Sequence, residues 1–165
     1  MSNLCEPLYV GNSFSTFLEN ETGKFIVMDM GSVNSDGNRV EIKRTNLKRD
    51  VLHLGDLVMP KDDIGGGQII GKTAYIPMEN RYVLGDHVFR IRTNKINSLF
   101  LHYLINSKSY NSAIKLNVTG SAQLGLRGVY VENSIINHPK KYDEQALISA
   151  ALQKIDSLIT LHQRK

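Results

Sequence analysis

The chain has few of the residues that build covalent or metal-held scaffolds. It contains one cysteine, Cys5, and no tryptophan among its 165 residues. A single cysteine excludes an internal disulfide and a cysteine-rich zinc site, and it favours a reducing compartment. The sequence therefore predicts a cytoplasmic protein without a disulfide framework and without a metal site.

Long apolar runs are also missing. No stretch approaches the roughly 20 apolar residues of a membrane-spanning helix, and residues 1–7 lack the basic and apolar regions of a secretory signal. Hydrophobic residues make up 41% and charged residues 22%, which is typical of a folded domain with a core. The net charge of +4 permits binding to phosphate groups but does not require it.

The first two-thirds of the chain carry strand patterns. The apolar run 25–30 predicts a buried strand. Asp36-Gly37 predicts a tight hairpin turn in front of an alternating, half-exposed strand over 39–43. Further strands are predicted over 56–59, 69–76 and 82–92, the last with a bulge at Gly85-Asp86.

After Asn97 the apolar residues recur at helical spacing. They predict a helix that Asn97 or Ser98 caps, followed by a second short helix over 108–116. A flexible polar loop is expected over 117–123, and a last strand around 129–136.

The C-terminal segment predicts a longer helix. Asp143 can cap it, and apolar residues then follow at alternating spacings of four and three, which is a heptad pattern. Two interpretations remain open: an amphipathic helix that folds onto its own domain, or a helix that pairs with a partner outside this chain. The expected fold class is α+β, a mixed β-rich domain with short helices followed by a coiled-coil-type helix. The residues of the heptad seam are Ile148, Leu152, Ile155 and Ile159.

Segment 66–73, GGQIIGKT, matches the phosphate-binding loop pattern GxxxxGK[ST]. In a true loop of this type a helix follows, and its N-terminal N–H groups bind the phosphates. Here Tyr75 and Ile76 favour a strand, and Pro77 would disrupt a helix. P-loop-type nucleotide binding is therefore kept only as an alternative function.

Asp29, Glu41 and Lys43 resemble the acidic-plus-lysine pattern of metal-dependent nucleases. The pattern is short, and an exposed strand with alternating charges explains it more simply. The five histidines show no HExxH spacing. The sequence therefore predicts no catalytic residue, no metal site and no cofactor.

Basic residues are interspersed with polar and aromatic ones, which suits nucleic-acid binding. Lysine and arginine contact phosphates, whereas arginine, amide and hydroxyl side chains read base edges. Segment 117–127 places such groups on a glycine-containing backbone. The candidate DNA-binding residues are Lys43, Arg44, Lys61, Lys72, Arg81, Arg92, Thr119, Ser121, Gln123 and Arg127.

Three segments resemble the specificity subunits of type I restriction–modification systems. LGDLVM at 54–59, followed by GKTA at 71–74, is similar to strand motifs of that family's recognition domains. NVTGSAQL at 117–124 is similar to its GSxQ loop. The most specific match is the run from Pro139 to Ile159, which resembles the start of the family's spacer helix.

The resemblance implies a target recognition domain over 1–140 and the start of a spacer and dimerisation helix over 141–165. It implies a non-catalytic module that binds double-stranded DNA and recognises one half of a bipartite target. Methyltransferase and restriction subunits would be its partners and would perform the chemistry. Since the family's subunit usually holds two recognition domains, we expect a half-subunit or truncated form, which a homodimer through the C-terminal helix would complete.

A third reading remains beside DNA recognition and nucleotide binding. The C-terminal helix alone would serve an interaction protein that docks a partner and never binds DNA.

Overall fold

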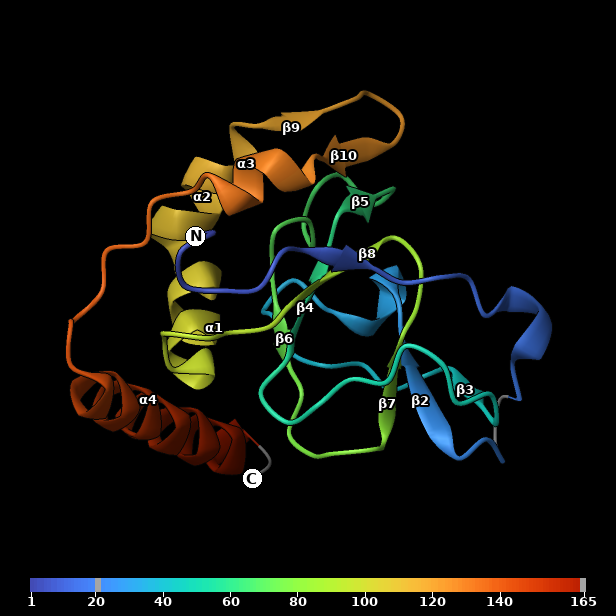
Figure 1. Ribbon diagram of the computed structural model, residues 1–165, viewed down its shortest axis with the longest axis horizontal. Coiled ribbons are helices and arrows are strands. Elements are labelled where there is room, and N and C mark those ends of the chain that lie inside the picture. The colour runs from blue at the N-terminus through green and yellow to red at the C-terminus, as the bar shows by residue number, and fades with distance from the viewer. Residues whose placement is uncertain (20–21, 164–165) are drawn as a thin grey trace.

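The computed structural model describes residues 1–19 and 22–163 (Figure 1). It has the expected α+β class, with small sheets at its centre, short helices beside them and a long C-terminal helix. Two one-turn 3-10 helices, η1 (Ser15–Phe17) and η2 (Met30–Ser32), lie in the loops of the N-terminal part. No helix in the described part combines the length and apolarity needed to cross a membrane.

The central sheet has four antiparallel strands in the order β1-β8-β4-β6. Both of its faces are covered, which explains why β4 reads as an unbroken apolar run with all four residues buried. Leu57 and Met59 point into one core cluster with helix α1, whereas Val58 points into a second cluster on the other face. The strands are β1 (Tyr9–Val10), β8 (Val88–Ile91), β4 (Leu57–Pro60) and β6 (Ala74–Tyr75).

A second sheet completes that other cluster. Its order is β3-β2-β7, with β2 antiparallel to β3 and parallel to β7. The strand predicted over 25–30 is confirmed as β2. The strands are β3 (Arg44–Thr45), β2 (Phe25–Met28) and β7 (Tyr82–Leu84).

Two of the predicted strands are corrected here. The hairpin turn is present, with Gly37 at φ +84°, but the strand over 39–43 is wrong beyond a bridge at Arg39. The side chains of this segment form contacts with distant strands: Arg39 donates to the carbonyl of Tyr75, and Glu41 accepts from Tyr82. Of the strand over 69–76, only 74–75 pairs.

The strand predicted over 82–92 is two strands in two different sheets. Gly85 marks a break between β7 and β8 and not a bulge, because the two strands belong to different sheets. The position is close-packed, since a Cβ there would meet Asp29 at 2.9 Å and Val27 at 3.1 Å. His87 has φ +61°, so the chain turns sharply before it enters the central sheet. The sequence pattern shows the strands but not this change of sheet.

The two helices predicted after Asn97 are confirmed. They are α1 (Ser98–Asn106), which the Asn97 side chain caps by accepting from Phe100 N at 2.9 Å, and α2 (Lys108–Lys115). The loop predicted over 117–123 is largely a β-hairpin, which extends a third sheet in the order β5-β10-β9. Its strands are β5 (Asp62–Asp63), β10 (Leu124–Leu126) and β9 (Val118–Thr119).

The strand expected around 129–136 is wrong, because helix α3 (Gly128–Glu132) forms there. Its β-branched residues favour a strand locally, but Val131 is fully buried in the core cluster of α1. The Met1 ammonium group donates to the carbonyls of Glu132 and Ser134, which holds the end of this helix. Tertiary contacts therefore override the local preference.

Helix α4 (Tyr142–Gln163) lies against α1, on the far side of α1 from the sheets (Figure 1). Asp143 and Glu144 occupy its first turn, where their negative charges interact favourably with the positive end of the helix dipole. The predicted C-terminal helix is confirmed, but it begins at Tyr142, so Asp143 lies inside the first turn and is not the cap as predicted.

Candidate nucleic-acid interface

The β9–β10 hairpin extends from one end of the molecule, beside β5 (Figure 1). Its tight tip requires glycine at 120, where φ is +109° and a Cβ would collide with the carbonyl oxygen of Gln123. The side chains around the tip are exposed. The structure thereby brings together three residues predicted to read bases, Thr119, Ser121 and Gln123.

An open cleft of about 420 Å³ lies at the base of this hairpin. Thr119 lines it from β9, and Lys61 and Arg127 line it from the segments that flank β5 and β10. Phe89 and Val10 supply an apolar wall from the central sheet. We call this cleft, together with the tip 120–123, the hairpin surface.

A carboxylate adjusts the charge of the hairpin surface. Asp62 accepts from Lys61 Nζ at 2.8 Å and contacts His87 Nδ1 at 2.7 Å. Burial alone would raise the pKa of Asp62, but the hydrogen bonds with Lys61 and His87 outweigh it, so the pKa lies below its ordinary value. Asp62 therefore stays ionised at neutral pH and holds the Lys61 side chain beside the hairpin.

Three other predicted residues lie on the second sheet. Lys43 precedes β3, Arg44 lies in β3, and Arg81 precedes β7 with its side chain exposed. Lys43 Nζ is paired with the Asp29 carboxylate at 2.5 Å. These residues belong to a different sheet from the hairpin surface.

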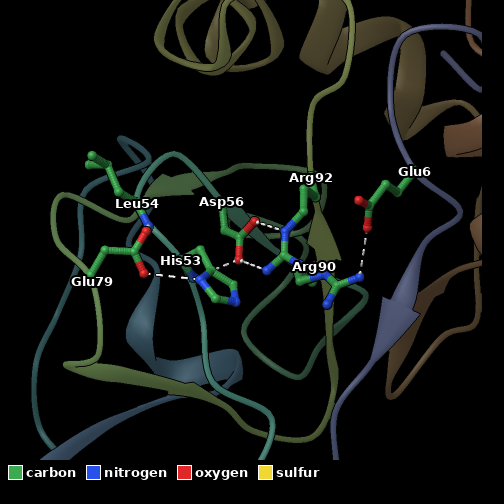
Figure 2. A network of polar contacts seen from close by, with 7 residues as sticks. All are labelled: Glu6, His53, Leu54, Asp56, Glu79, Arg90 and Arg92. Atoms are coloured by element: carbon green, nitrogen blue, oxygen red, sulfur yellow. Dashed lines mark hydrogen bonds and ion pairs between the residues drawn. The ribbon is translucent and has the colours of Figure 1, made fainter.

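Arg92 is engaged inside the protein (Figure 2). Its guanidinium donates from two nitrogens to the two carboxylate oxygens of Asp56, both at 2.7 Å. Asp56 is 2% exposed and also accepts from the backbone N–H of His53 at 2.8 Å. The hydrogen bond with Asp56 raises the pKa of Arg92, so this pair is a fixed link between β8 and the loop before β4.

Two more basic side chains near this pair, Arg90 and His53, each contact a glutamate (Figure 2). Arg90 donates to Glu6 at 3.3 Å and stacks over the ring of Tyr9 at 5.2 Å. His53 contacts Glu79 at 3.0 Å. The network joins the N-terminal segment to the central sheet.

Lys72 has a comparable internal contact. Its ammonium donates to the carbonyl of Asn106 at 3.0 Å, at the C-terminus of α1. Burial, and after it the charge of Lys115, lowers the pKa of Lys72. A cation at this place satisfies a terminal helix carbonyl and interacts favourably with the helix dipole.

The glycine-rich segment before Lys72 is not built as a phosphate-binding loop. It runs between β5 and β6, and a strand follows it instead of a helix. Two of its N–H groups, those of Gly65 and Ile69, already donate to the buried carboxylate of Asp63, at 2.5 and 3.0 Å. The geometry does not favour nucleotide binding.

The nuclease-like pattern is likewise divided between separate contacts. Asp29 binds Lys43 and the backbone of Gly31, whereas Glu41 contacts Arg39 and Tyr82. Within residues 1–19 and 22–163, no group of three histidine, cysteine or acidic side chains is placed to hold a metal ion.

Sequence reasoning missed the part of the hairpin surface that comes from distant strands. Asp62 from β5 and Phe89 from β8 line the cleft together, and His87 contacts Asp62, although these residues are about 25 positions apart in the sequence. No local pattern carried that signal.

The heptad seam of α4 lies in solvent. Ile148 and Leu152 are 36% exposed, and Ile155 and Ile159 are 50% exposed. The two buried residues of the helix are polar, Gln145 and Ser149. The helix does fold against its own domain, but not through its apolar stripe as an ordinary amphipathic helix would.

Comparison with known proteins gives one family. A family model described as "Type I restriction modification DNA specificity domain" matches residues 4–165. No curated protein sequence matches the chain.

Several solved structures have a similar fold. The type I restriction–modification S subunit from M. genitalium is 16% identical, with a TM-score of 0.71 over 94% of this chain and 37% of that chain. The HsdS subunit from Thermoanaerobacter tengcongensis is 17% identical, with a TM-score of 0.64 over 99% and 37%.

A third similar structure is described as the structural basis of complex assembly and conformational transition of the type I R-M system. It is 16% identical, with a TM-score of 0.70 over 98% of this chain and 38% of that chain. The chain thus spans less than two-fifths of the length of the solved proteins that it matches.

Proposed function

Because this chain belongs to the family of type I restriction modification DNA specificity domains, we propose that it is a sequence-specific DNA-binding module without catalysis of its own. The observation that carries the proposal is the family match over nearly the whole chain, residues 4–165. In this proposal residues 1–140 are one target recognition domain and 141–165 begin a spacer helix. The module reads one half of a bipartite target in double-stranded DNA.

The hairpin surface is the proposed reading element. A two-stranded β-ribbon fits the major groove of B-DNA, and β9–β10 is an exposed ribbon with hydroxyl and amide groups near its tip. In the proposal Thr119, Ser121 and Gln123 contact base edges. Lys61 and Arg127, on either side of the cleft, contact phosphates and set the register.

The basic residues of the second sheet are assigned a lesser part. Lys43, Arg44 and Arg81 add sequence-independent attraction to phosphates. Arg92 and Lys72 are left out of the contact surface because their charged groups are bound within the protein and do not line the cleft. Lys61 is also paired, with Asp62, but it lines the open cleft beside the hairpin.

The exposed seam of α4 is the proposed partner surface. Its four apolar residues repeat at heptad spacing, which is the pattern that pairs helices. A second copy of the chain, joined through this seam, would supply the other recognition domain and a symmetric bipartite target. Methyltransferase and restriction subunits of the same system would then perform the chemistry on the DNA so selected.

Selection from a random duplex library tests the DNA-reading proposal. The full chain is incubated with the library, alone and with the methyltransferase subunit of its system, and the retained DNA is sequenced. We expect one enriched half-site, with an affinity that falls steeply as salt rises. No enriched sequence in either condition would contradict the proposal.

Sedimentation equilibrium tests the partner surface separately. Replacing Ile155 by Glu places a charge in the seam and should weaken self-association by at least about tenfold, since charges are excluded from such apolar positions. Gln153→Glu, which adds the same charge at an exposed position of α4 outside the seam, is the matched control. A chain that stays monomeric at high concentration would contradict the homodimer.

A further inference from the structure

The most deeply buried side chains of helix α4 are polar, while its large apolar side chains keep at least a third of their surface exposed. Gln145 and Ser149 are 1% and 2% exposed, whereas Leu147 and Leu158 are 73% and 58% exposed. An ordinary surface helix of a globular domain has the opposite arrangement. Hydrogen bonds therefore hold the two ends of the contact between α4 and α1, beside the partly covered Ile148 and Leu152.

Gln145 forms the near end of this contact. Its Oε1 accepts from the backbone N–H of Asn97 at 2.8 Å, and its Nε2 donates to the carbonyl of Pro139 at 2.7 Å. Asn97 is also the cap of α1, and the Ser149 hydroxyl, which donates to the carbonyl of Ala146 at 3.0 Å, lies 3.4 Å from Asn97 Oδ1. One buried amide thus links the start of α1, the segment before α4 and α4 itself.

Tyr103 and Asp156 form the far end. The phenol of Tyr103, on α1, donates to Asp156 Oδ2 at 2.8 Å. Burial, and then the hydrogen bond with Asp156, raises the pKa of Tyr103, so the phenol remains a donor across the physiological range. Gln145 and Asp156 are eleven residues apart, which is about 16 Å along a helix.

Two anchors at that separation define a direction as well as a position. Hydrogen bonds lose strength quickly when their angle changes, so the buried Gln145 contacts fix one end of α4 and the Tyr103–Asp156 bond, at the surface, orients the other. We call Asn97, Tyr103, Gln145, Ser149 and Asp156 the α1–α4 joint.

We infer that the α1–α4 joint sets the angle between the spacer helix and the hairpin surface, and that it thereby selects the length of the DNA spacer between two half-sites. The inference rests on the proposed function. Each base pair adds about 3.4 Å to B-DNA, so a tilt that moves the hairpin by that distance changes the preferred spacer by one base pair. The joint reads no base itself, and its residues are positioning residues.

Distance measurement by pulsed electron paramagnetic resonance tests the joint without DNA. Spin labels are placed at Lys48→Cys, in the domain, and Lys154→Cys, on α4, both at exposed positions. Cys5 is buried, and burial raises its pKa to about 11, so its thiol reacts poorly and the labels go to the introduced cysteines. An excess of unlabelled chain removes distances between copies.

We expect one narrow distance distribution in the parent protein, and a broadened or shifted distribution after Gln145→Ala or Tyr103→Phe. The matched controls are Gln153→Ala and Tyr142→Phe, which change the same residue types at exposed positions of α4. Tyr103→Phe removes a single hydroxyl, so it tests the joint even if Gln145→Ala unfolds the helix. Identical distributions in Tyr103→Phe and the parent would overturn the inference.

Selection from a library of paired half-sites with spacers of varied length tests the consequence. We expect the parent to enrich one spacer length, and the joint variants to lose that preference several-fold while they retain the same half-site sequence. An unchanged spacer preference, or loss of half-site and spacer together, would overturn the positioning role. If the parent enriches no half-site at all, the proposed function fails, and the resonance distances still decide whether the joint holds the helix.

Discussion

The hairpin surface and the α1–α4 joint use the same residue types in opposite environments. Gln123 lies in solvent near the hairpin tip, whereas Gln145 is 1% exposed and has its amide satisfied on both sides. Arg127 and Arg92 differ in the same way, since Arg127 is exposed and Arg92 is bound by a buried carboxylate. A polar side chain is accessible to a ligand in the first environment and fixes the structure in the second.

The difference has an energetic basis. A buried polar group without its partner costs far more than an exposed one, because water no longer replaces the lost hydrogen bond. Substitutions of buried polar residues should therefore lower stability, whereas substitutions at the hairpin surface should change DNA binding and leave stability intact.

Arg92→Ala should have the largest effect. It leaves the Asp56 carboxylate, 2% exposed, without its two strongest partners, and we expect a loss of about 3 kcal/mol in the free energy of unfolding. Urea denaturation measures it. Arg81→Ala, at an exposed arginine, is the control and should stay within about 0.5 kcal/mol of the parent. Equal effects of the two substitutions would remove the contrast between an arginine bound to a buried carboxylate and an exposed arginine.

His102 should make stability depend on pH. Its Nδ1 faces the Thr73 hydroxyl at 3.2 Å and the Asn106 amide at 3.3 Å, and burial lowers its pKa from 6.5 to about 4. Between these values the unfolded chain binds a proton that the folded chain does not, so stability falls as the pH drops from 6.5 towards 4. The full loss is on the order of 3 kcal/mol.

Urea midpoints at pH 7 and pH 4.5 measure this loss in the parent and in His102→Gln. The difference between the urea midpoints at pH 7 and pH 4.5 should be smaller in His102→Gln than in the parent. It should be unchanged in His162→Asn, which replaces an exposed histidine on α4. If the urea midpoint changes with pH as much in His102→Gln as in the parent, other groups cause the pH dependence.

Gln123→Ala tests the exposed side of the comparison. If Gln123 makes a bidentate contact with a base, its loss should lower discrimination at that position by about 1–3 kcal/mol, with no change in the urea midpoint. Competition binding against single-base variants of the selected half-site measures it. Gln153→Ala is the matched control. A drop in stability without a change in base preference would place Gln123 with the structural residues.

Arg127→Ala and Lys72→Ala should separate a phosphate contact from an internal one, with the smallest effects of the series. Arg127→Ala should weaken binding to all sequences alike and lower the salt slope by about 1. Lys72→Ala should leave binding unchanged and lower stability by about 1 kcal/mol, because it removes a hydrogen bond to Asn106. Binding titrations at several salt concentrations, with urea denaturation, distinguish the two. The reverse result would move Lys72 to the DNA surface.

Local patterns predicted several parts of the fold. The apolar run at 25–30, the Asn97 cap and the spacing in α4 each depend on neighbours a few residues apart, and each appears as predicted. The predicted strand around 129–136 was wrong because Val131 is drawn into a distant core cluster, which no window of sequence contains. The predicted loop over 117–123 became a hairpin because β5 was available to pair with it.

The sequence by itself determined the α+β class, the C-terminal helix with its heptad spacing, and the family. Each of these depends on residue type and on spacing along the chain. Only the tertiary structure decided which polar residues remain exposed. Lys61 and Arg127 reach one cleft, Arg92 and Lys72 are bound internally, and α4 turns Gln145 inward and its apolar seam outward. The reason is physical: burial depends on contacts between segments far apart in the sequence, and burial determines whether the same charge or amide binds a ligand or holds the fold.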